Sequence, residues 1–138
     1  MDNDFIEKLN DFINDKADLQ GMHSTINSFS DVDNTVSVMD AASPSDPISV
    51  DMMGMERMLF NYSIDVKCDD QQKAYGVIGS IAGLLKDPAI DIKSANDSFF
   101  LEAIKVAKVG EPMINEHGIY LFSLPISAQL EIFLNLED

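Results

Sequence analysis

Asp31, Asp33 and Asn34 have the residue types and the spacing with which a calcium-binding loop begins. Such a loop offers oxygen ligands at alternate positions. It needs glycine at its sixth position for a sharp turn, and its twelfth residue is a glutamate that binds the ion with both oxygens. Counted from Asp31, the sixth position is Val36 and the twelfth is Ala42. The segment therefore lacks the residues that complete a calcium loop, and we predict no metal site.

The residues that could support catalysis do not form a recognisable set. The two histidines, His23 and His117, are far apart in the sequence, and each has turn-like polar neighbours. The motifs HExxH, CxxC and GxSxG, which indicate zinc, redox and nucleophile chemistry, are absent. Gly76, Gly79 and Gly83 fall within a helical pattern, where they favour close packing rather than phosphate binding. The sequence therefore predicts a protein that is not an enzyme and has no cofactor.

The chain is strongly acidic, with 24 Asp and Glu against 9 Lys and Arg and a formal net charge of −15 at pH 7. No Lys or Arg occurs from residue 17 to residue 56. Binding to nucleic-acid phosphate or to an anionic membrane is disfavoured, because such binding needs a basic patch. An acidic surface can keep a protein soluble, mimic DNA, or line a passage through which DNA moves without sticking. The acidic residues of this stretch are Asp18, Asp31, Asp33, Asp40, Asp46, Asp51 and Glu56.

The elements that must position these groups are clearest in the middle of the chain. From residue 58 to residue 68 every even-numbered residue is apolar, which is the period-2 pattern of a strand with one buried face. Asp69 and Asp70 then provide a helix N-cap, and Pro88 ends the helix that follows. A long strand with a helix packed on it predicts a two-layer α/β nucleus. The apolar stripe of this helix comprises Ala74, Val77, Ile78, Ile81, Leu84 and Leu85.

The first half of the chain predicts one helix and two strands. Residues 4–16 form an amphipathic helix with its apolar residues on one side. Strands are expected at 23–29 and 35–42. The segment 43–55 has two prolines near its start and several methionines after them, and we interpret it as a long arm or hairpin. Its methionines are either core filler or a pliable interaction surface.

The last third of the chain predicts a hairpin, with strands at 99–109 and 119–134. Pro125 interrupts the second strand, which predicts an edge strand, a bulge or a pair of shorter strands there. The order of elements is then α-β-β-β-α-β-β. We therefore expect an α+β fold with a mainly antiparallel sheet, two helices packed on one face and a long β-β arm.

Length and composition favour one domain over residues 1–138. A chain of 138 residues that is 46% hydrophobic can bury a substantial core. The acidic N-terminus argues against a secretory signal, and the apolar runs are too short to span a bilayer. Cys68 is the single cysteine and falls on the buried face of its strand, so we expect an inert thiol.

Two segments, RMLFNYSIDVKCDDQQKAYGVIGSIAGLL and GIYLFSLPISAQLEI, carry a resemblance to a known family. In the order of its elements the chain resembles the tail terminator proteins of long-tailed bacteriophages, which are also grouped as tail completion or minor capsid proteins. Such a subunit has an N-terminal helix, a long strand that leads into a helix, and a closing hairpin. Tyr120 and Phe122 form the aromatic pair of the closing strand. The Met-rich arm and Pro125 depart from the pattern.

The resemblance implies a structural role in the virion, at the interface between head and tail, for a protein made in the bacterial host cytoplasm. Tail terminator subunits form a homohexameric ring that caps the head-proximal end of the tail tube, stops its polymerisation and docks the head connector. The implied partners are copies of the chain, the tail tube protein and a head-completion or connector protein. DNA passes through the ring without specific binding, and acidic walls would ease its passage. Our candidates for the bore are Asp31, Asp33, Asp40, Asp46 and Asp51.

Two further surfaces are candidates for contact with a neighbouring subunit or with the tail tube. One is the arm 43–55, and the other is the polar face of the long strand. The candidate residues are Met52, Met53, Met55, Asn61, Ser63 and Asp65.

Two other functions also fit the sequence. An acidic decoy that mimics DNA and inhibits a host DNA-binding defence enzyme explains the charge of −15 equally well, but it explains the arm and the number of strands less well. Another head–tail connector, such as a head-completion subunit, shares the location and differs in ring symmetry. Oligomeric state separates a ring-forming protein from a small decoy.

Overall fold

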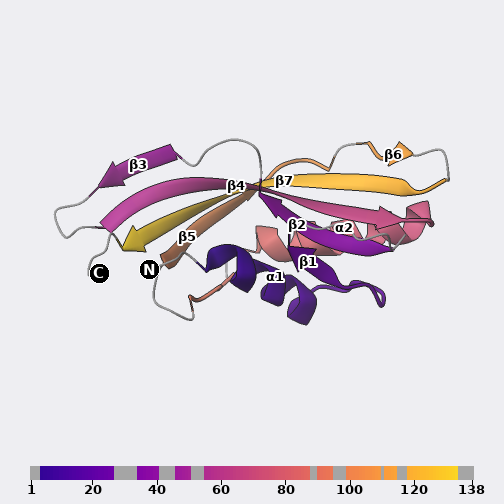
Figure 1. Cartoon of the computed structure of the whole chain (residues 1–138), viewed down its shortest axis with the longest axis horizontal. Helices are drawn as coiled ribbons and strands as arrows, with labels where there is room; N and C mark the ends of the chain where they lie inside the picture. Colours follow the sequence, from indigo (N-terminus) through magenta and orange to yellow (C-terminus); the bar gives the residue numbers. More distant parts are fainter. Residues whose placement is uncertain are drawn as a thin grey trace.

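The computed structural model describes residues 4–26, 34–40, 46–50, 55–87, 90–94, 99–109, 111–114 and 118–133. These residues form two helices and seven strands (Figure 1). In chain order the elements are α1 (Phe5–Lys16), β1 (Ser24–Ile26), β2 (Thr35–Asp40), β3 (Asp46–Val50), β4 (Met55–Cys68), α2 (Gln71–Lys86), β5 (Phe99–Val106), β6 (Met113–Ile114) and β7 (Tyr120–Phe133).

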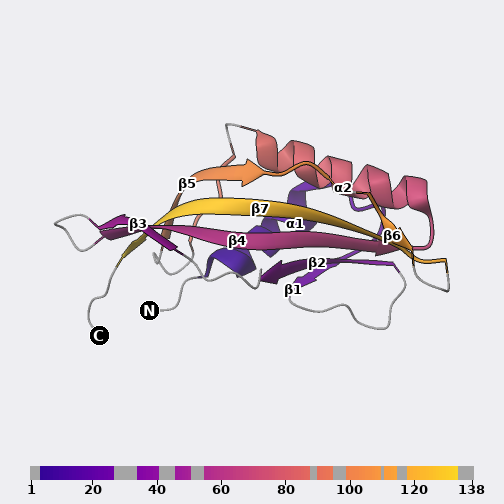
Figure 2. The same ribbon diagram turned by 90° about the horizontal axis from the view of Figure 1, so that it is seen from above.

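All seven strands belong to one sheet with the order β1-β2-β4-β7-β5, in which β3 also pairs with β4 and β6 with β7. The two 14-residue strands β4 and β7 form its centre and pair antiparallel from Met55–Phe133 to Cys68–Tyr120. The pairing of β1 with β2 is parallel, and every other pairing is antiparallel. Figure 2 shows β5 and β2 on opposite sides of the central pair.

Both helices lie on the same face of the sheet (Figure 1). The buried apolar residues of the helices and of the sheet belong to one cluster. The ring of Phe5 in α1 contacts Tyr62 of β4 and Phe99 of β5, with centroid distances of 5.6 and 5.2 Å. Such aromatic pairs add stabilisation beyond the area that they bury. The predicted α+β fold, with a mainly antiparallel sheet and helices on one face, is confirmed.

The alternation in the central segment decides which side of β4 meets the helices. Ile64, Val66 and Cys68 are fully buried, whereas the odd-numbered residues between them are partly exposed. In the register with β7, Ile64 is opposite Leu124 and Val66 is opposite Phe122. Because residues opposite each other in a sheet point to the same side, the two strands present one continuous apolar face to the helices.

Helix α2 begins where the sequence predicts. The Asp70 carboxylate accepts hydrogen bonds from the backbone N–H groups of Gln72 and Lys73, at 3.0 and 3.2 Å. This satisfies two of the N–H groups that have no partner within the helix. The helix then buries Val77, Ile78 and Ile81 against the sheet.

The predicted order of elements is confirmed, and β3 and β6 add two strands to it. Within the arm 43–55 the structure describes the backbone of β3, which pairs with β4, and of Met55, the first residue of β4. Residues 43–45 and 51–54 lie outside the described residues.

The prediction for Pro125 is wrong, because β7 is one continuous strand between β4 and β5. The carbonyl oxygen of Pro125 accepts a hydrogen bond from the N–H of Ala107, at 3.0 Å. In an antiparallel strand the nitrogen and the carbonyl of one residue face the same neighbour. The nitrogen of Pro125 therefore faces the side of β5, just past Val106 where β5 ends. The missing N–H costs the long β4–β7 pairing no hydrogen bond.

Candidate interaction surface

The face of the sheet opposite the helices carries the polar side chains of three strands, and we call it the open face. It follows from the alternation of β4 and β7, whose odd-numbered residues point away from the core. Most of these side chains are partly exposed. The open face comprises Arg57, Leu59, Asn61, Ser63, Asp65 and Lys67 of β4, Leu121, Ser123, Pro125, Ser127, Gln129 and Glu131 of β7, and Phe100, Glu102, Ala103 and Lys105 of β5.

An ion pair joins the two strands that flank β7. Arg57 of β4 donates from Nε and Nη2 to the two carboxylate oxygens of Glu102 of β5, at 2.7 and 3.1 Å. The amide of Gln129, on β7 between them, donates to Glu102 Oε1 at 3.0 Å. Glu131 lies farther away, with Oε2 at 3.9 Å from Arg57 Nη2.

This environment favours the charged form of Glu102. The hydrogen bonds from Arg57 are the largest cause, and together with those of Gln129 and the positive charge of Arg57 they hold the pKa of Glu102 below its usual value of 4.5. Partial burial of the carboxylate acts in the opposite direction and is outweighed. The cluster therefore stays ionised near neutral pH and fixes β4, β7 and β5 to one another.

Farther along the open face lie smaller hydrogen-bonded groups. Ser127 donates to Asn61 Oδ1 at 2.8 Å across the β4–β7 pair, and Ser63 donates to Asp65 Oδ1 at 2.6 Å along β4. The two residues of the first pair stand opposite each other in the register, which brings the hydroxyl to the amide. Each of these side chains is half-buried or partly exposed, so it remains in reach of a partner.

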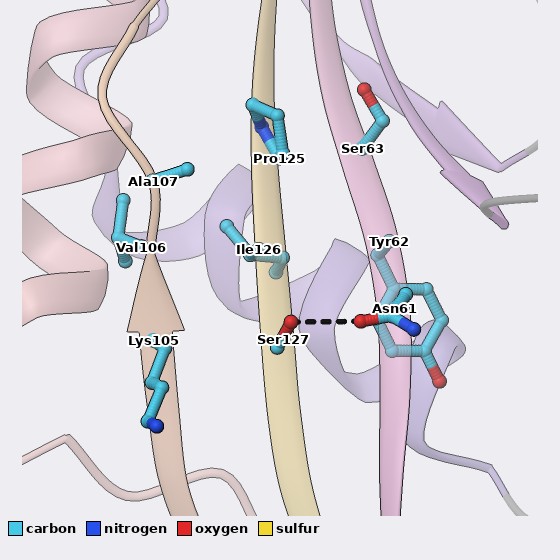
Figure 3. Close-up of a pocket in the computed structure, with 9 residues that line it drawn as sticks. All are labelled: Asn61, Tyr62, Ser63, Lys105, Val106, Ala107, Pro125, Ile126 and Ser127. Carbon is cyan, nitrogen blue, oxygen red and sulfur yellow. Dashed lines mark hydrogen bonds between the residues drawn. The ribbon is translucent and has the colours of Figure 1, made fainter. Parts of the chain in front are cut away.

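A shallow cavity of about 410 Å³ lies on this face, where β5 ends and its continuation turns aside from β7. Figure 3 shows Asn61 and Ser63 on β4, Ser127 on β7 and Lys105 on β5 around it. Its lining offers hydroxyl, amide and ammonium groups, which suit hydrogen bonding to a polar surface. In the part of the chain that the structure describes, no three His, Cys, Asp or Glu side chains gather to hold a metal ion.

The structure places the candidate contact residues of β4 together. Asn61, Ser63 and Asp65 lie on the open face, as the alternation predicts. Met55 is the first residue of β4 and is described by its backbone alone. Met52 and Met53 lie outside the described residues.

The candidate bore residues fall largely where the structure gives no side chains. Asp40 ends β2 opposite Tyr62, and Asp46 begins β3 opposite Leu59, so the backbones of both run beside one stretch of β4. Asp31, Asp33 and Asp51 lie outside the described residues. The role of all five as bore residues stays a prediction.

Sequence reasoning missed the ion pair of Arg57 with Glu102 and a set of exposed apolar side chains. The polar odd-numbered positions of β4 pointed to Arg57, but its partner is 45 residues away and depends on the register of β5. The exposed apolar residues are Tyr75, Phe100, Met113 and Ile114, each at least 60% exposed. Phe100 lies on the edge strand β5, and Met113 and Ile114 form β6.

Comparison with known proteins shows a shared fold. No protein-family model matches the chain, and no curated protein matches it. Its structure is similar to a chain in the virion of a native gene transfer agent particle, with a TM-score of 0.57 and 14% sequence identity. The similarity covers 82% of this chain and 81% of that chain. Among the described residues, neither helix is long and apolar enough to cross a membrane.

Proposed function

We propose that this chain is a structural protein of a virion and, within the virion, a tail terminator subunit. The observation that carries the proposal is the fold, which matches a gene transfer agent virion chain over 82% of this chain. The match also covers 81% of the other chain, so it extends over most of both chains. The resemblance of the sequence to phage tail terminator proteins supports the finer assignment, to the junction of head and tail.

The proposed assembly is a homohexameric ring on the head-proximal end of the tail tube, at the junction of head and tail. The ring stops polymerisation of the tube protein and provides the surface on which a head-completion or connector protein docks. A ring of subunits with a charge of −15 each suits a bore that repels DNA phosphates and lets DNA pass without specific binding. The bore residues in this proposal are Asp31, Asp33, Asp40, Asp46 and Asp51.

The open face and the arm 43–55 supply the contacts with neighbouring subunits or with the tail tube. The open face supports this role because its hydroxyl and amide groups are held in fixed positions by hydrogen bonds and remain partly exposed. Interfaces of this kind combine such polar groups with apolar anchors. In this proposal the anchors are methionines of the arm, and the contact residues are Met52, Met53, Met55, Asn61, Ser63 and Asp65.

Negative-stain electron microscopy of the purified protein, with light scattering on a sizing column, tests this proposal. We expect annular particles with six subunits, and we expect them to attach to one end of tubes formed by the cognate tail tube protein. A protein that stays monomeric at high concentration and does not attach to tube ends would contradict the proposal.

A DNA-mimic decoy is the second candidate, and the charge of −15, with no Lys or Arg from residue 17 to residue 56, favours it. Such a protein would bind a basic nuclease as a monomer or dimer and inhibit it, and the binding would weaken steeply with salt. A head-completion subunit is the third candidate. It would form a ring of different symmetry, which class averages of the same images distinguish from a hexamer.

A further inference from the structure

We propose that the outer edge of β5 receives strand β3 of a second copy of the chain, so that the sheet continues from one subunit into the next. The proposal rests on the ring assembly proposed above and names the contact that builds it. It requires an open strand edge on one subunit, a donor strand at the opposite edge of the other, and compatible charge.

Strand β5 supplies the open edge. It is the last strand in the order of the sheet and pairs with β7 on one side. On its other side the described residues contribute one isolated bridge, between Lys93 and Phe100. No described strand lies beside the outer edge from Leu101 to Val106. Such an edge presents backbone N–H and C=O groups that can pair with a strand of another chain.

A groove lined by apolar and charged side chains lies beside this edge, and we call it the edge groove. Two cavities of about 370 Å³ each lie between β5 and residues 85–87 and 90–94, and both are lined by Ile90 and Leu101. Phe100, at its rim, is 61% exposed. A strand added to β5 would bury this surface with its own apolar side chains. The apolar residues of the edge groove are Leu85, Ile90, Ile92, Phe99, Phe100, Leu101, Ala103 and Ile104.

Strand β3 supplies the donor at the opposite edge. One side of β4 is paired with β7 over its whole length, so β3 pairs with β4 on the other side, where β2 also lies. β3 and β5 are therefore on opposite sides of the central pair. A contact between β3 of one copy and β5 of the next joins two different patches, and contacts of this type generate closed rings or open filaments. A homohexameric ring needs a contact of this type.

Charge favours β3 against β5 over β3 against β3. From residue 40 to residue 56 the chain has acidic residues and no basic one, so two such segments would repel each other. The surroundings of β5, by contrast, carry four lysines. Lys105 is exposed on β5 itself, Lys108 follows it, and Lys86 and Lys93 line the edge groove.

Three acidic residues also line the edge groove, namely Asp87, Asp91 and Glu102. Glu102 is held by Arg57 on the open face, at 2.7 Å. Asp91 lies 3.5 Å from Lys93 in an exposed pair, and such pairs are easily exchanged for a new partner. Glu102 and Asp91 thus each have a basic partner. An acidic strand at the β5 edge would lie near Lys86, Lys93, Lys105 and Lys108.

A cysteine cross-link tests the contact directly. Ser49→Cys places a thiol on β3, and Ala103→Cys places one on the exposed part of β5. The native Cys68 is buried and does not compete. Each single variant is oxidised alone, and the two are oxidised as a mixture. We expect a disulfide-linked dimer in the mixture at tenfold or more the yield of either variant alone, because the contact joins unlike edges.

Cross-linking tests the contact between β3 and β5, and light scattering on the unmodified chain separately measures the number of subunits in a particle. A mixture without the cross-link, or with equal yield in the Ser49→Cys variant alone, overturns the contact. If six-subunit rings form all the same, the proposed function stands without it. If the mixture cross-links and the unmodified chain forms open oligomers, the contact holds and the closed hexamer fails.

A charge exchange provides the second measurement. Lys105→Glu with Lys108→Glu in the β5-bearing copy should lower the cross-linking yield at least threefold, and Asp46→Lys in the β3-bearing copy should restore much of it. The matched control reverses Lys16 at the end of α1 and Lys73 in the first turn of α2, which changes the net charge equally, and neither residue lines the edge groove. If the control pair lowers the yield of cross-linked dimer as much as the pair near β5 does, charge has no specific role at this contact. That result also overturns the argument for β3 as the donor.

Discussion

Arg57 and Glu102 form a two-hydrogen-bond ion pair that reaches across β7 and joins two strands that do not touch in the sheet. The pair lies on the open face, away from the helices and the apolar core. The amide of Gln129, on the strand between them, donates a hydrogen bond to the same carboxylate, at 3.0 Å. The open face therefore has a fixed arrangement of polar groups at the end of the sheet where β3 and β5 also lie.

Replacing Glu102 with glutamine should lower the free energy of unfolding by about 1 kcal/mol. Hydrogen bonds to charged groups contribute roughly 1.5–3 kcal/mol when buried, and the 40% exposure of the Arg57 side chain reduces this. Urea unfolding followed by circular dichroism measures the change. Glu131→Gln, on the same face but with its oxygen 3.9 Å from Arg57, is the matched control and should change the free energy by less than about 0.5 kcal/mol. Equal effects of the two substitutions would contradict the importance of the Arg57–Glu102 pair.

The stabilisation from Glu102 should depend on pH. Because its pKa in the folded protein lies below the usual 4.5, the folded state holds the charged form more strongly than the unfolded chain does. The contribution is complete above the unfolded pKa and is lost as the pH falls through the folded pKa. The difference in unfolding free energy between the native chain and Glu102→Gln should be constant near neutral pH and should shrink below about pH 4.5. A difference that grows on acidification would contradict this.

Replacing Asp70 with alanine should destabilise the protein by about 1 kcal/mol, because the two N–H groups of Gln72 and Lys73 lose their acceptor. Thermal unfolding measures the effect. Asp69→Ala removes the same charge one residue earlier, from a side chain that does not cap α2, and should have a smaller effect. If both substitutions lower the stability of the folded protein equally, the contribution of Asp70 comes from its charge near the helix terminus and not from the capping hydrogen bonds.

Reversing the charge of Asp31, Asp33 and Asp40 together should impair ring assembly or the passage of DNA. The reason is that a bore with added positive charge would hold DNA phosphates instead of repelling them. Infectivity of particles that carry the triple variant is the measurement, together with images of the purified protein. Unchanged infectivity would remove these three residues from the proposed bore.

The control for this experiment reverses three different aspartates, Asp11, Asp15 and Asp69, which are exposed. It shifts the net charge by the same amount at positions outside the stretch from 17 to 56. If the control and the test variant lose infectivity equally, overall charge explains the loss and the bore assignment is wrong.

The sequence determined by itself those features that depend on a few neighbouring residues. The alternation of apolar residues from 58 to 68 predicted the buried side of β4, because side chains of a strand point to opposite faces in turn. Asp70 predicted the start of α2, because its carboxylate reaches N–H groups only two and three residues ahead. Asn61, Ser63 and Asp65 were placed on the open face by the same alternation. Their role as contact residues stays a prediction.

Tertiary structure alone decided which distant strands meet and in what register. The 14-residue pairing of β4 with β7 brings Pro125 to a position where its nitrogen faces away from β4, and this allowed a continuous strand that the local pattern argued against. The partner of Arg57 and the opposite positions of β3 and β5 were decided in the same way. Local periodicity specifies a face of a strand and not its partner, because the partner is selected by the packing of the whole sheet against the helices.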